Sequence, residues 1–361
     1  MSALFEHLKS RIQNEGPLSL DAYMAEALSH PEHGYYWKGD PLGSAGDFVT
    51  APEISQMFGE LLGLWSVVCW RQLGAPATLN LIELGPGRGT LMADGMRAAG
   101  NVAAFYDALR VHLVETSPVL RKLQQAALAA IYRPIHWHDQ VDQVPDGPFI
   151  LLANEFLDAL PIRQFVSTDG GWQERSIGLT IAGDALKWTS SALSAADGLY
   201  VPPALATGSE NQIYEVCPAA HIIIREISRM IMKHKGVALF IDYGYAAQTG
   251  GDTFQAVADH QYADPLAHPG DADLTAHVDF EAVARLAGHA GVRVSGPVTQ
   301  GTFLLNLGIG PRADTLMDAA SSAQKRDIET ALERLTGDDA MGGLFKVIAL
   351  SHPDLPDPGG F

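Results

Sequence analysis

Residues 78–91 read TLNLIELGPGRGTL, and this stretch decides the fold of the chain. An apolar run at residues 79–84, with Glu83 near its end, leads into Gly85-Pro86-Gly87-Arg88-Gly89. The pattern predicts a buried strand that turns sharply into a helix, because glycine adopts backbone angles that other residues avoid and lets a ligand come close. The N–H groups at the start of the helix would face that ligand. The stretch therefore predicts a site for a nucleotide-like cofactor.

The acidic residues around the turn indicate which cofactor it is. Dinucleotide enzymes favour G-x-G-x-x-G, whereas the spacing here is G-x-G-x-G. Glu83 would repel a pyrophosphate but suits the cationic amino group and sulfonium of S-adenosylmethionine. A second apolar run, residues 109–114, precedes Glu115, which can accept hydrogen bonds from both ribose hydroxyls, as in dinucleotide folds. We therefore predict S-adenosylmethionine, with an ordinary strand–helix turn and solvated acids as the alternative.

Composition places the chain among soluble globular proteins. Its 361 residues are 47% hydrophobic and 18% charged, and no apolar run approaches the roughly 20 residues of a membrane span. The first residues, MSALFEHLKSRIQNEG, resemble neither a secretory signal nor an Arg-rich transit peptide. Cys69 and Cys217 lie in apolar surroundings and are predicted to be reduced packing residues. These features predict a cytoplasmic location.

The charge balance indicates the kind of partner. A net charge of −18 repels nucleic-acid phosphates and anionic membranes and attracts a basic segment. We therefore expect a protein substrate with a basic or arginine-bearing segment, and neither nucleic acid nor membrane as a partner. The alternative is that the acidity serves solubility only. No residue spacing resembles a zinc site, so no metal is expected.

Strands and helices alternate through the middle of the chain. Mostly apolar strands are predicted at residues 79–84, 111–114, 135–137, 149–153 and 237–242. Such alternation is typical of a parallel, doubly wound sheet of the Rossmann-like α/β class.

The remaining segments are assigned around this core. We expect an N-terminal helical region with a lid at residues 1–75, a core at 76–161 and 235–350, an inserted subdomain at 162–234 and a loose tail at 351–361. The insertion should be antiparallel, with strands at 163–166, 172–178 and 185–188 followed by a helix at 219–234. A helix is predicted at 280–290, and an antiparallel edge pair at 303–307 and 344–350.

Two helix starts have candidate capping residues. A long buried helix is predicted at residues 53–73, with Thr50 as N-cap and Glu53 completing a capping box. Within residues 1–35, which are also predicted to be helical, Ser19 or Asp21 is expected to cap the second helix.

The end of the fourth strand carries polar residues that are suited to chemistry. Residues 154–161 read NEFLDALP, and ligands of open α/β sheets bind beyond the carboxyl ends of the strands. Asn154 is expected to contact the cofactor. Glu155 and Asp158 could hold an arginine guanidinium bidentately and accept its proton. The alternative is that they cap the next helix.

Later residues supply further candidates. Asp242 follows the fifth strand, and His277 lies in a polar loop, where it could act as a general base or contact the cofactor. A surface or capping role is the alternative for this histidine. His136 and His138 are expected to pack or to line the adenine pocket.

Several of these motifs together resemble the MidA family of class I S-adenosylmethionine-dependent methyltransferases. They are GDF-x-T-x-PEIS at residues 46–55, FGE at 58–60, ELGPGRG at 83–89, NEFLDALP at 154–161, IDYGY at 241–245 and DLTAHVDF at 273–280. The motifs occur in the family's order. The family includes the mitochondrial complex I assembly-factor arginine methyltransferase.

The resemblance implies a Rossmann-like methyltransferase with an inserted subdomain and a protein arginine substrate. In the mitochondrial members this substrate is a subunit of the respiratory NADH dehydrogenase. The resemblance also implies cofactor binding at Gly85, Gly87, Gly89 and Glu115. Gly46-Asp47 is implied to lie close to the cofactor.

The absence of a targeting segment predicts a bacterial member, whose substrate need not be the same. A cofactor-binding assembly chaperone without turnover is the principal alternative function, because the insertion and the acidic surface offer a protein-binding face. A nicotinamide oxidoreductase is a weaker alternative.

Overall fold

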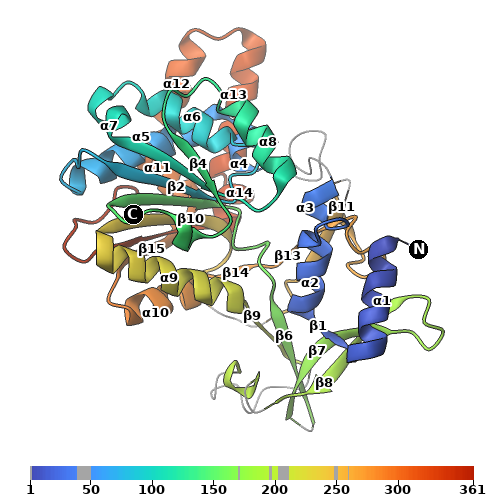
Figure 1. The fold of residues 1–361 in the computed structure, drawn as a ribbon. Helices are drawn as coiled ribbons and strands as arrows, with labels where there is room; N and C mark the ends of the chain where they lie inside the picture. Colours follow the sequence, from blue (N-terminus) through green and yellow to red (C-terminus); the bar gives the residue numbers. More distant parts are fainter. Residues whose placement is uncertain are drawn as a thin grey trace.

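The computed structural model describes residues 2–38, 50–169, 171–194, 197–201, 211–247, 251–258 and 260–361. The described chain forms two lobes (Figure 1). The larger lobe is built on an eight-stranded sheet and the smaller on a five-stranded sheet, with a third sheet of three short strands.

The large sheet confirms the predicted α/β class. Five parallel strands form its centre, β16 runs antiparallel to β10, β15 runs antiparallel to β16, and β14 adds to the end of β10. The strands in spatial order are β15 (Arg293–Thr299), β16 (Phe345–Ser351), β10 (Gly236–Tyr245), β5 (Phe149–Asn154), β2 (Leu79–Leu84), β3 (Leu109–Val114) and β4 (Ile135–His138), with β14 at Val278–Asp279.

Helices cover both faces of this sheet, as expected for strands that are apolar on both sides (Figure 1). One face packs against α5 (Gln56–Gln72), α6 (Thr90–Ala99), α7 (Ala103–Ala108), α11 (Gln300–Leu307), α12 (Ile309–Asp318) and α13 (Ser322–Thr336). The other face packs against α9 (Pro218–His234), α10 (Phe280–His289) and the short η1 (Val141–Gln143). The smaller elements α4 (Ala51–Ile54), α8 (Pro118–Ala127) and α14 (Met341–Leu344) complete this lobe.

The smaller lobe contains the antiparallel insertion that the sequence predicts between strands four and five. Its sheet runs β1 (Leu18–Ser19), β7 (Gly171–Leu179), β6 (Arg163–Thr168) and β9 (Ile213–Val216), with β8 (Leu186–Ala192) paired to β7. Also in the described chain are α1 (Ala3–Glu15), α2 (Leu20–Ser29), α3 (Tyr35–Lys38), η2 (Asp197–Leu199), β11 (Gln255–Ala258), β12 (Gln261–Ala263) and β13 (Asp273–Thr275).

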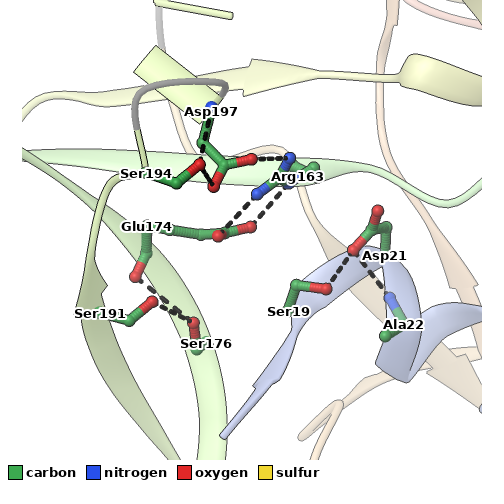
Figure 2. A network of polar contacts seen from close by, with 9 residues as sticks. All are labelled: Ser19, Asp21, Ala22, Arg163, Glu174, Ser176, Ser191, Ser194 and Asp197. Atoms are coloured by element: carbon green, nitrogen blue, oxygen red, sulfur yellow. Dashed lines mark hydrogen bonds and ion pairs between the residues drawn. The ribbon is translucent and has the colours of Figure 1, made fainter.

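A partly buried ion-pair network connects the smaller sheet to η2. Arg163 donates two hydrogen bonds to the carboxylate of Glu174, both 2.7 Å, and a third of 2.7 Å to Asp197 (Figure 2). The guanidinium also lies 5.3 Å from the ring centroid of Tyr200. Bidentate pairing of this kind fixes geometry as well as charge, so the network orients η2 against β6 and β7.

The N-terminal region expected at residues 1–75 divides between the two lobes. The first two helices pack with the inserted strands in one hydrophobic cluster, whereas residues 51–72 pack on the large sheet. Residues 1–75 therefore do not form one unit. The tail also differs from the expected loose segment, because Trp65 donates a hydrogen bond of 3.0 Å to the carbonyl of Gly359 and Phe361 packs on Phe303.

The prediction of a late strand at residues 303–307 is wrong. This apolar run lies inside α11, whose start is capped by Thr299 and whose end is Gly308 at φ 91°. Strand β15 takes the expected place beside β16. A short apolar run does not by itself distinguish a helix from a strand, and here the two caps decide.

The predicted caps are also corrected. The helix expected at 53–73 breaks at Ser55, whose extended backbone separates α4 from α5 and whose hydroxyl caps α5 by accepting from Met57 N. The Thr50 side chain makes no cap bond, and the Glu53 carboxylate accepts a hydrogen bond from Thr90 instead. Ser19 is the N-cap residue of α2, as expected, but its side chain makes no cap bond and its hydroxyl donates to the Asp21 carboxylate (Figure 2). The Asp21 carboxylate in turn accepts from the N–H of Ala22 at 2.9 Å.

Candidate functional site

The carboxyl ends of the central parallel strands open into a cavity of about 930 Å³. Its wall draws on both lobes: Ser29 and α3 from one side, and residues 50–53, the strand ends and α9 from the other. Both polar and apolar side chains line it. The lining includes Tyr36, Trp37, Thr50, Glu53, Glu83, Gly85, Gly87, Arg88, Glu115, Gln140, Asn154, Glu155, Phe156, Leu160, Ile222, Ile223 and Arg225.

The glycine turn after β2 contributes the floor of the cavity. Gly85, Gly87 and Gly89 have φ values of 59°, 52° and 86°, which side chains disfavour. A Cβ on Gly85 would lie 2.9 Å from the ring of Phe156. The turn thus presents bare backbone to the cavity. Of the three glycines, only Gly89 is absent from the cavity wall; it precedes α6 as the N-cap residue.

Glu83 brings an unpaired acceptor to the cavity wall. Its side chain is buried, and its Oε2 has no hydrogen-bond partner among the described residues. Burial raises the pKa of this carboxyl to about 8. A buried acceptor without a partner is costly, so the position is suited to a ligand that carries a cationic donor.

Glu115 is already held by the protein. Its carboxylate accepts from the N–H of Ser117 at 2.7 Å and from the amide of Gln124 at 3.2 Å. The same Gln124 amide donates to the carbonyl of Gly87 at 2.8 Å. Burial raises the Glu115 pKa, and these hydrogen bonds oppose the shift. Gln124 therefore connects the turn after β2 to the end of β3, a role that the sequence analysis missed.

Asn154 and Glu155 lie at the end of β5 in the same wall. The Asn154 amide donates to Glu155 Oε1 at 2.9 Å, and the N–H of Ala51 donates to the same oxygen at 3.0 Å. Asn154 Oδ1 is buried without a partner among the described residues. Glu155 has φ 51°, unusual for a residue with a side chain. Burial raises its pKa to about 7.

Asp242 holds the turn that carries Glu155. From β10, its Oδ2 accepts three backbone N–H groups, from Phe156 at 3.1 Å, Leu157 at 2.9 Å and Asp158 at 3.2 Å. Asp242 is buried and outside the cavity wall. Burial raises its pKa, and the charges of Asp158 and Glu155 raise it further. Its observed role is to position the turn.

The structure does not place the expected carboxylate pair side by side in the cavity. Glu155 lines the wall, whereas Asp158 lies behind it, buried, with Oδ1 unpaired among the described residues. Burial raises the Asp158 pKa to about 6. The charge of Asp158 is one of the causes that raise the Glu155 pKa, so the second carboxyl acts on the first electrostatically.

The histidine candidates lie away from the main cavity. His277 lines a separate cavity of about 40 Å³ and packs edge-on against Tyr243 at 5.4 Å between ring centroids. Burial lowers the pKa of His277, and the positive charge of Lys346 lowers it further. Neither His136 nor His138 lines the main cavity; the latter approaches His112 at 2.9 Å.

Sequence reasoning also missed the contribution of α3. Tyr36 and Trp37 line the cavity. The Tyr36 hydroxyl donates to Asp273 at 3.0 Å, and its backbone carbonyl accepts from the Ser117 hydroxyl at 2.7 Å. These bonds tie α3 to both lobes. No motif marks these aromatic residues in the sequence. The predicted cofactor residues Gly46-Asp47 lie outside the described residues.

One group of metal-ligating side chains occurs within the described ranges, at His7, Glu26 and His30, whose ligand atoms lie within 4.8 Å of one another. His30 Nδ1 accepts the N–H groups of Glu32 and His33, each at 3.2 Å. In the neutral ring the other nitrogen then carries the proton and is not free to bind a metal. The group therefore does not make a metal site.

The main cavity fits S-adenosylmethionine. It has the volume of a small-molecule site, a bare glycine turn, and two buried acceptors, Glu83 Oε2 and Asn154 Oδ1, that need donors. A sulfonium compound with an amino group supplies both the positive charge and the donors. A pyrophosphate would instead meet the carboxyl of Glu83.

Comparisons with known proteins agree with this cofactor. Residues 61–298 match the family described as S-adenosyl-L-methionine-dependent methyltransferase. A Burkholderia thailandensis protein, described as a candidate methyl transferase and crystallised with S-adenosyl-homocysteine, superimposes with a TM-score of 0.81 at 29% identity, covering 97% of this chain and 92% of that one.

Relatives similar over nearly the whole chain carry a more specific name. The Xenopus laevis and Homo sapiens proteins called "Protein arginine methyltransferase NDUFAF7, mitochondrial" are 37% and 36% identical, over 97% of this chain and 84% and 83% of their own lengths. A Drosophila melanogaster homolog is 35% identical over 96% of this chain and 84% of its own length.

The prediction of a cytoplasmic location is contradicted by these relatives, which are named as mitochondrial. Among the described residues, no helix is both long and apolar enough to cross a membrane.

The resemblance to the MidA family is thus confirmed, and the bare glycine turn, the orphaned acceptors and the family match agree on one cofactor. The chain belongs to this family and is an S-adenosylmethionine-dependent methyltransferase.

Proposed function

We propose that the chain methylates arginine in a protein substrate. The observation that carries the proposal is Glu155, a carboxyl in the wall of the cavity whose pKa is raised to about 7 by burial. A guanidinium is a poor nucleophile because it stays protonated. A carboxylate beside it can align one nitrogen and take its proton. Glu155 can do so near neutral pH.

The cofactor residues form part of the proposal. Glu83 and Asn154 would hold the amino-acid end, Gly85 and Gly87 would let the backbone come close, and Glu115 would receive the ribose hydroxyls. Gly89 would shape the turn from outside the cavity wall. The unpaired acceptors on the first two residues support these assignments.

The chemistry divides between cofactor and protein. S-adenosylmethionine supplies an activated methyl group, so the protein has to align the nucleophile and exclude water. A bond forms between the arginine nitrogen and the methyl carbon as the sulfur–methyl bond breaks. The nitrogen's proton passes to the Glu155 carboxylate. Asp242 keeps that carboxylate in place through the backbone of the turn, and Asp158 favours proton uptake through its charge.

The names of the relatives support arginine as the target. A subunit of the respiratory NADH dehydrogenase is the first substrate to try, because the sequence resemblance implies it.

The experiment compares wild-type protein with Glu155→Gln. Each is incubated with isotope-labelled S-adenosylmethionine and extract from cells that lack the protein, and labelled residues are identified by mass spectrometry. Gln keeps the acceptor for the N–H of Ala51 but cannot take a proton, so labelling of arginine should fall about 100-fold. Affinity for S-adenosylhomocysteine should be unchanged.

Glu333→Gln, an exposed change on α13, is the matched control and should label like wild type. Labelling of a residue other than arginine would overturn the choice of substrate. Undiminished labelling by Glu155→Gln would remove Glu155 from the mechanism.

A further inference from the structure

One wall of the cavity has chemistry that cofactor binding does not require. Six residues of α9 line it, and we call them the α9 lip: Ala219, Ile222, Ile223, Arg225, Glu226 and Arg229. The cavity, at about 930 Å³, is near the upper end of the range for small-molecule pockets. The lip therefore offers surface for a second ligand beside the cofactor.

The apolar part of the lip faces water. Ile222 is 67% exposed, although it lies next to the half-buried Ile223 and lines the cavity. Residues three and four apart on a helix share a face, so Ala219, Ile222 and Ile223 form one small apolar surface at the start of α9. Leu160 also lines the cavity and packs in the same hydrophobic cluster as Ile223. This surface is continuous with the cavity rather than isolated on the outside.

The charged part of the lip contains one unpaired cation. Glu226 is paired with Arg229, with hydrogen bonds of 3.1 Å and 2.5 Å. Arg225 is exposed and makes no hydrogen bond or ion pair with any residue that the structure describes. On a protein with a net charge of −18, most of the surface repels carboxylates. The Arg225 guanidinium beside the cavity instead attracts a carboxylate, which it can bind through two parallel hydrogen bonds.

We infer that the α9 lip binds the substrate segment next to the methylated residue, with an apolar side chain on Ile222 and an acidic side chain on Arg225. The inference rests on the proposed function, since it concerns the substrate of the same site. It adds that an arginine is selected by its neighbours in the chain. The free guanidinium and the exposed isoleucine lie one helical turn apart, so both contacts fall within a short peptide.

The test starts from the labelled sites identified in the extract with wild-type protein. Synthetic peptides are made around one labelled site, with the flanking acidic residue kept, replaced by alanine or replaced by lysine. The wild-type KM should be lowest for the acidic peptide. Arg225→Glu should raise the KM of the acidic peptide and lower that of the lysine peptide, each by about fivefold. Turnover at saturating peptide and affinity for S-adenosylhomocysteine should change less than twofold.

Two matched controls separate this effect from a general one. Arg326→Glu changes an exposed residue of α13 with the same charge reversal and should leave all three KM values unaltered. Ile222→Asp should raise the KM of every peptide. Met232→Asp, on the same helix but outside the cavity wall, should not.

Three results would overturn the inference. Equal KM values of Arg225→Glu for the three peptides would remove the acidic contact. Labelled sites without an acidic residue nearby would do the same while leaving the proposed function intact. Absence of any labelled arginine, with cofactor affinity retained, would overturn the proposed function and this inference with it.

Discussion

Two neighbouring turns at the carboxyl edge of the large sheet face the same cavity but are held in opposite ways. The turn after β2 reaches positive φ with glycines at residues 85, 87 and 89. The turn after β5 reaches φ 51° with Glu155, a residue that disfavours it. There, the backbone is held from outside by Asp242, which receives three N–H groups.

The difference reflects what each turn must present. The first offers bare backbone to a ligand, so its conformation has to come from residues without side chains. The second offers a carboxylate, so it needs a side chain at a strained position and a neighbour that stabilises it. Strain of this kind costs about 1–3 kcal/mol and is typical of functional sites. We expect the first turn to fail when its own residues change, and the second to fail when its neighbour changes.

The largest expected effect is on the glycine turn. Gly87→Val places a β-branched side chain at φ 52°, where even unbranched residues cost about 1–2 kcal/mol. Affinity for S-adenosylhomocysteine should fall at least about tenfold, because a loss of about 1.4 kcal/mol has that effect. Calorimetric titration measures it.

Gly183→Val is the control for that change. Gly183 also has a positive φ, 70°, but lies in the hairpin between β7 and β8 with open space around it. It should lose comparable stability and keep full affinity for the cofactor. Equal cofactor loss in both variants would show that the glycine turn acts through stability alone.

A smaller loss is expected when the neighbour of the second turn changes. Both carboxylate oxygens of Asp242 accept hydrogen bonds from backbone N–H groups. Asp242→Asn replaces one of these oxygens by an NH₂ group, which cannot accept, so at least one backbone N–H loses its partner. Loss of a buried hydrogen-bond partner costs about 1–3 kcal/mol. Methyl transfer to extract proteins should fall about tenfold, with cofactor affinity altered less than twofold.

Asp146→Asn, at an exposed ion pair with Lys233, should transfer methyl groups like wild type. If Asp242→Asn lost cofactor affinity and turnover in parallel, the second turn would not be a separate unit.

Cofactor affinity should also depend on pH through Glu83. Its pKa is raised to about 8 by burial, so the cofactor-free protein holds a proton there at neutral pH. A cationic ligand favours the carboxylate, and binding should therefore release a proton. Affinity should rise from pH 6 to 7.5, by at most roughly tenfold per pH unit, and level off above pH 8.

The same shift acts on stability with the opposite sign. The folded state binds the Glu83 proton more tightly than the unfolded state does. The contribution of Glu83 to stability therefore falls as the pH rises from the ordinary pKa of a glutamate toward the folded-state pKa of about 8. Glu83→Gln should remove both dependences. An unchanged pH profile of cofactor binding in this variant would assign the proton to another group.

The smallest expected effect concerns the segment that donates Ala51 N–H to Glu155. Ser55 caps α5, so Ser55→Ala should lower the free energy of unfolding by about 1 kcal/mol. The Thr50 side chain makes no cap bond, so Thr50→Ala should change it by less than about 0.5 kcal/mol. Urea unfolding measures both. A larger loss of stability in Thr50→Ala than in Ser55→Ala would instead support the capping box of Thr50 and Glu53 that the sequence analysis predicted.

The sequence analysis identified most of the sheet because apolar runs of strand length are local signals. It missed the helix at residues 300–307, where caps outweighed the apolar run, and it assigned the N-terminal helices to one unit with residues 51–72. The first error overlooked two local capping residues, Thr299 and Gly308. The second concerns packing partners, which a single sequence does not display.

The candidate site divides along the same line. The glycine turn, Glu83, Glu115 and Glu155 could be recognised from residue type and position in the chain, and all but Gly89 lie in the cavity wall. Tyr36 and the α9 lip could not be recognised, because no local pattern distinguishes a helix residue that faces a cavity from one that faces water. Nor does any local pattern mark Gln124, whose partners Gly87 and Glu115 are distant in the chain.

The sequence by itself determined the fold class and the cofactor, because a glycine turn after a buried strand needs only residues that are adjacent in the chain. The tertiary structure alone decided which acid faces the cavity. Glu155 and Asp158 are equivalent in the sequence, but three backbone hydrogen bonds to Asp242, more than eighty residues away, hold the turn so that one carboxyl lines the wall and the other lies behind it. Long-range hydrogen bonds of this kind depend on the strand order, which only the folded chain establishes.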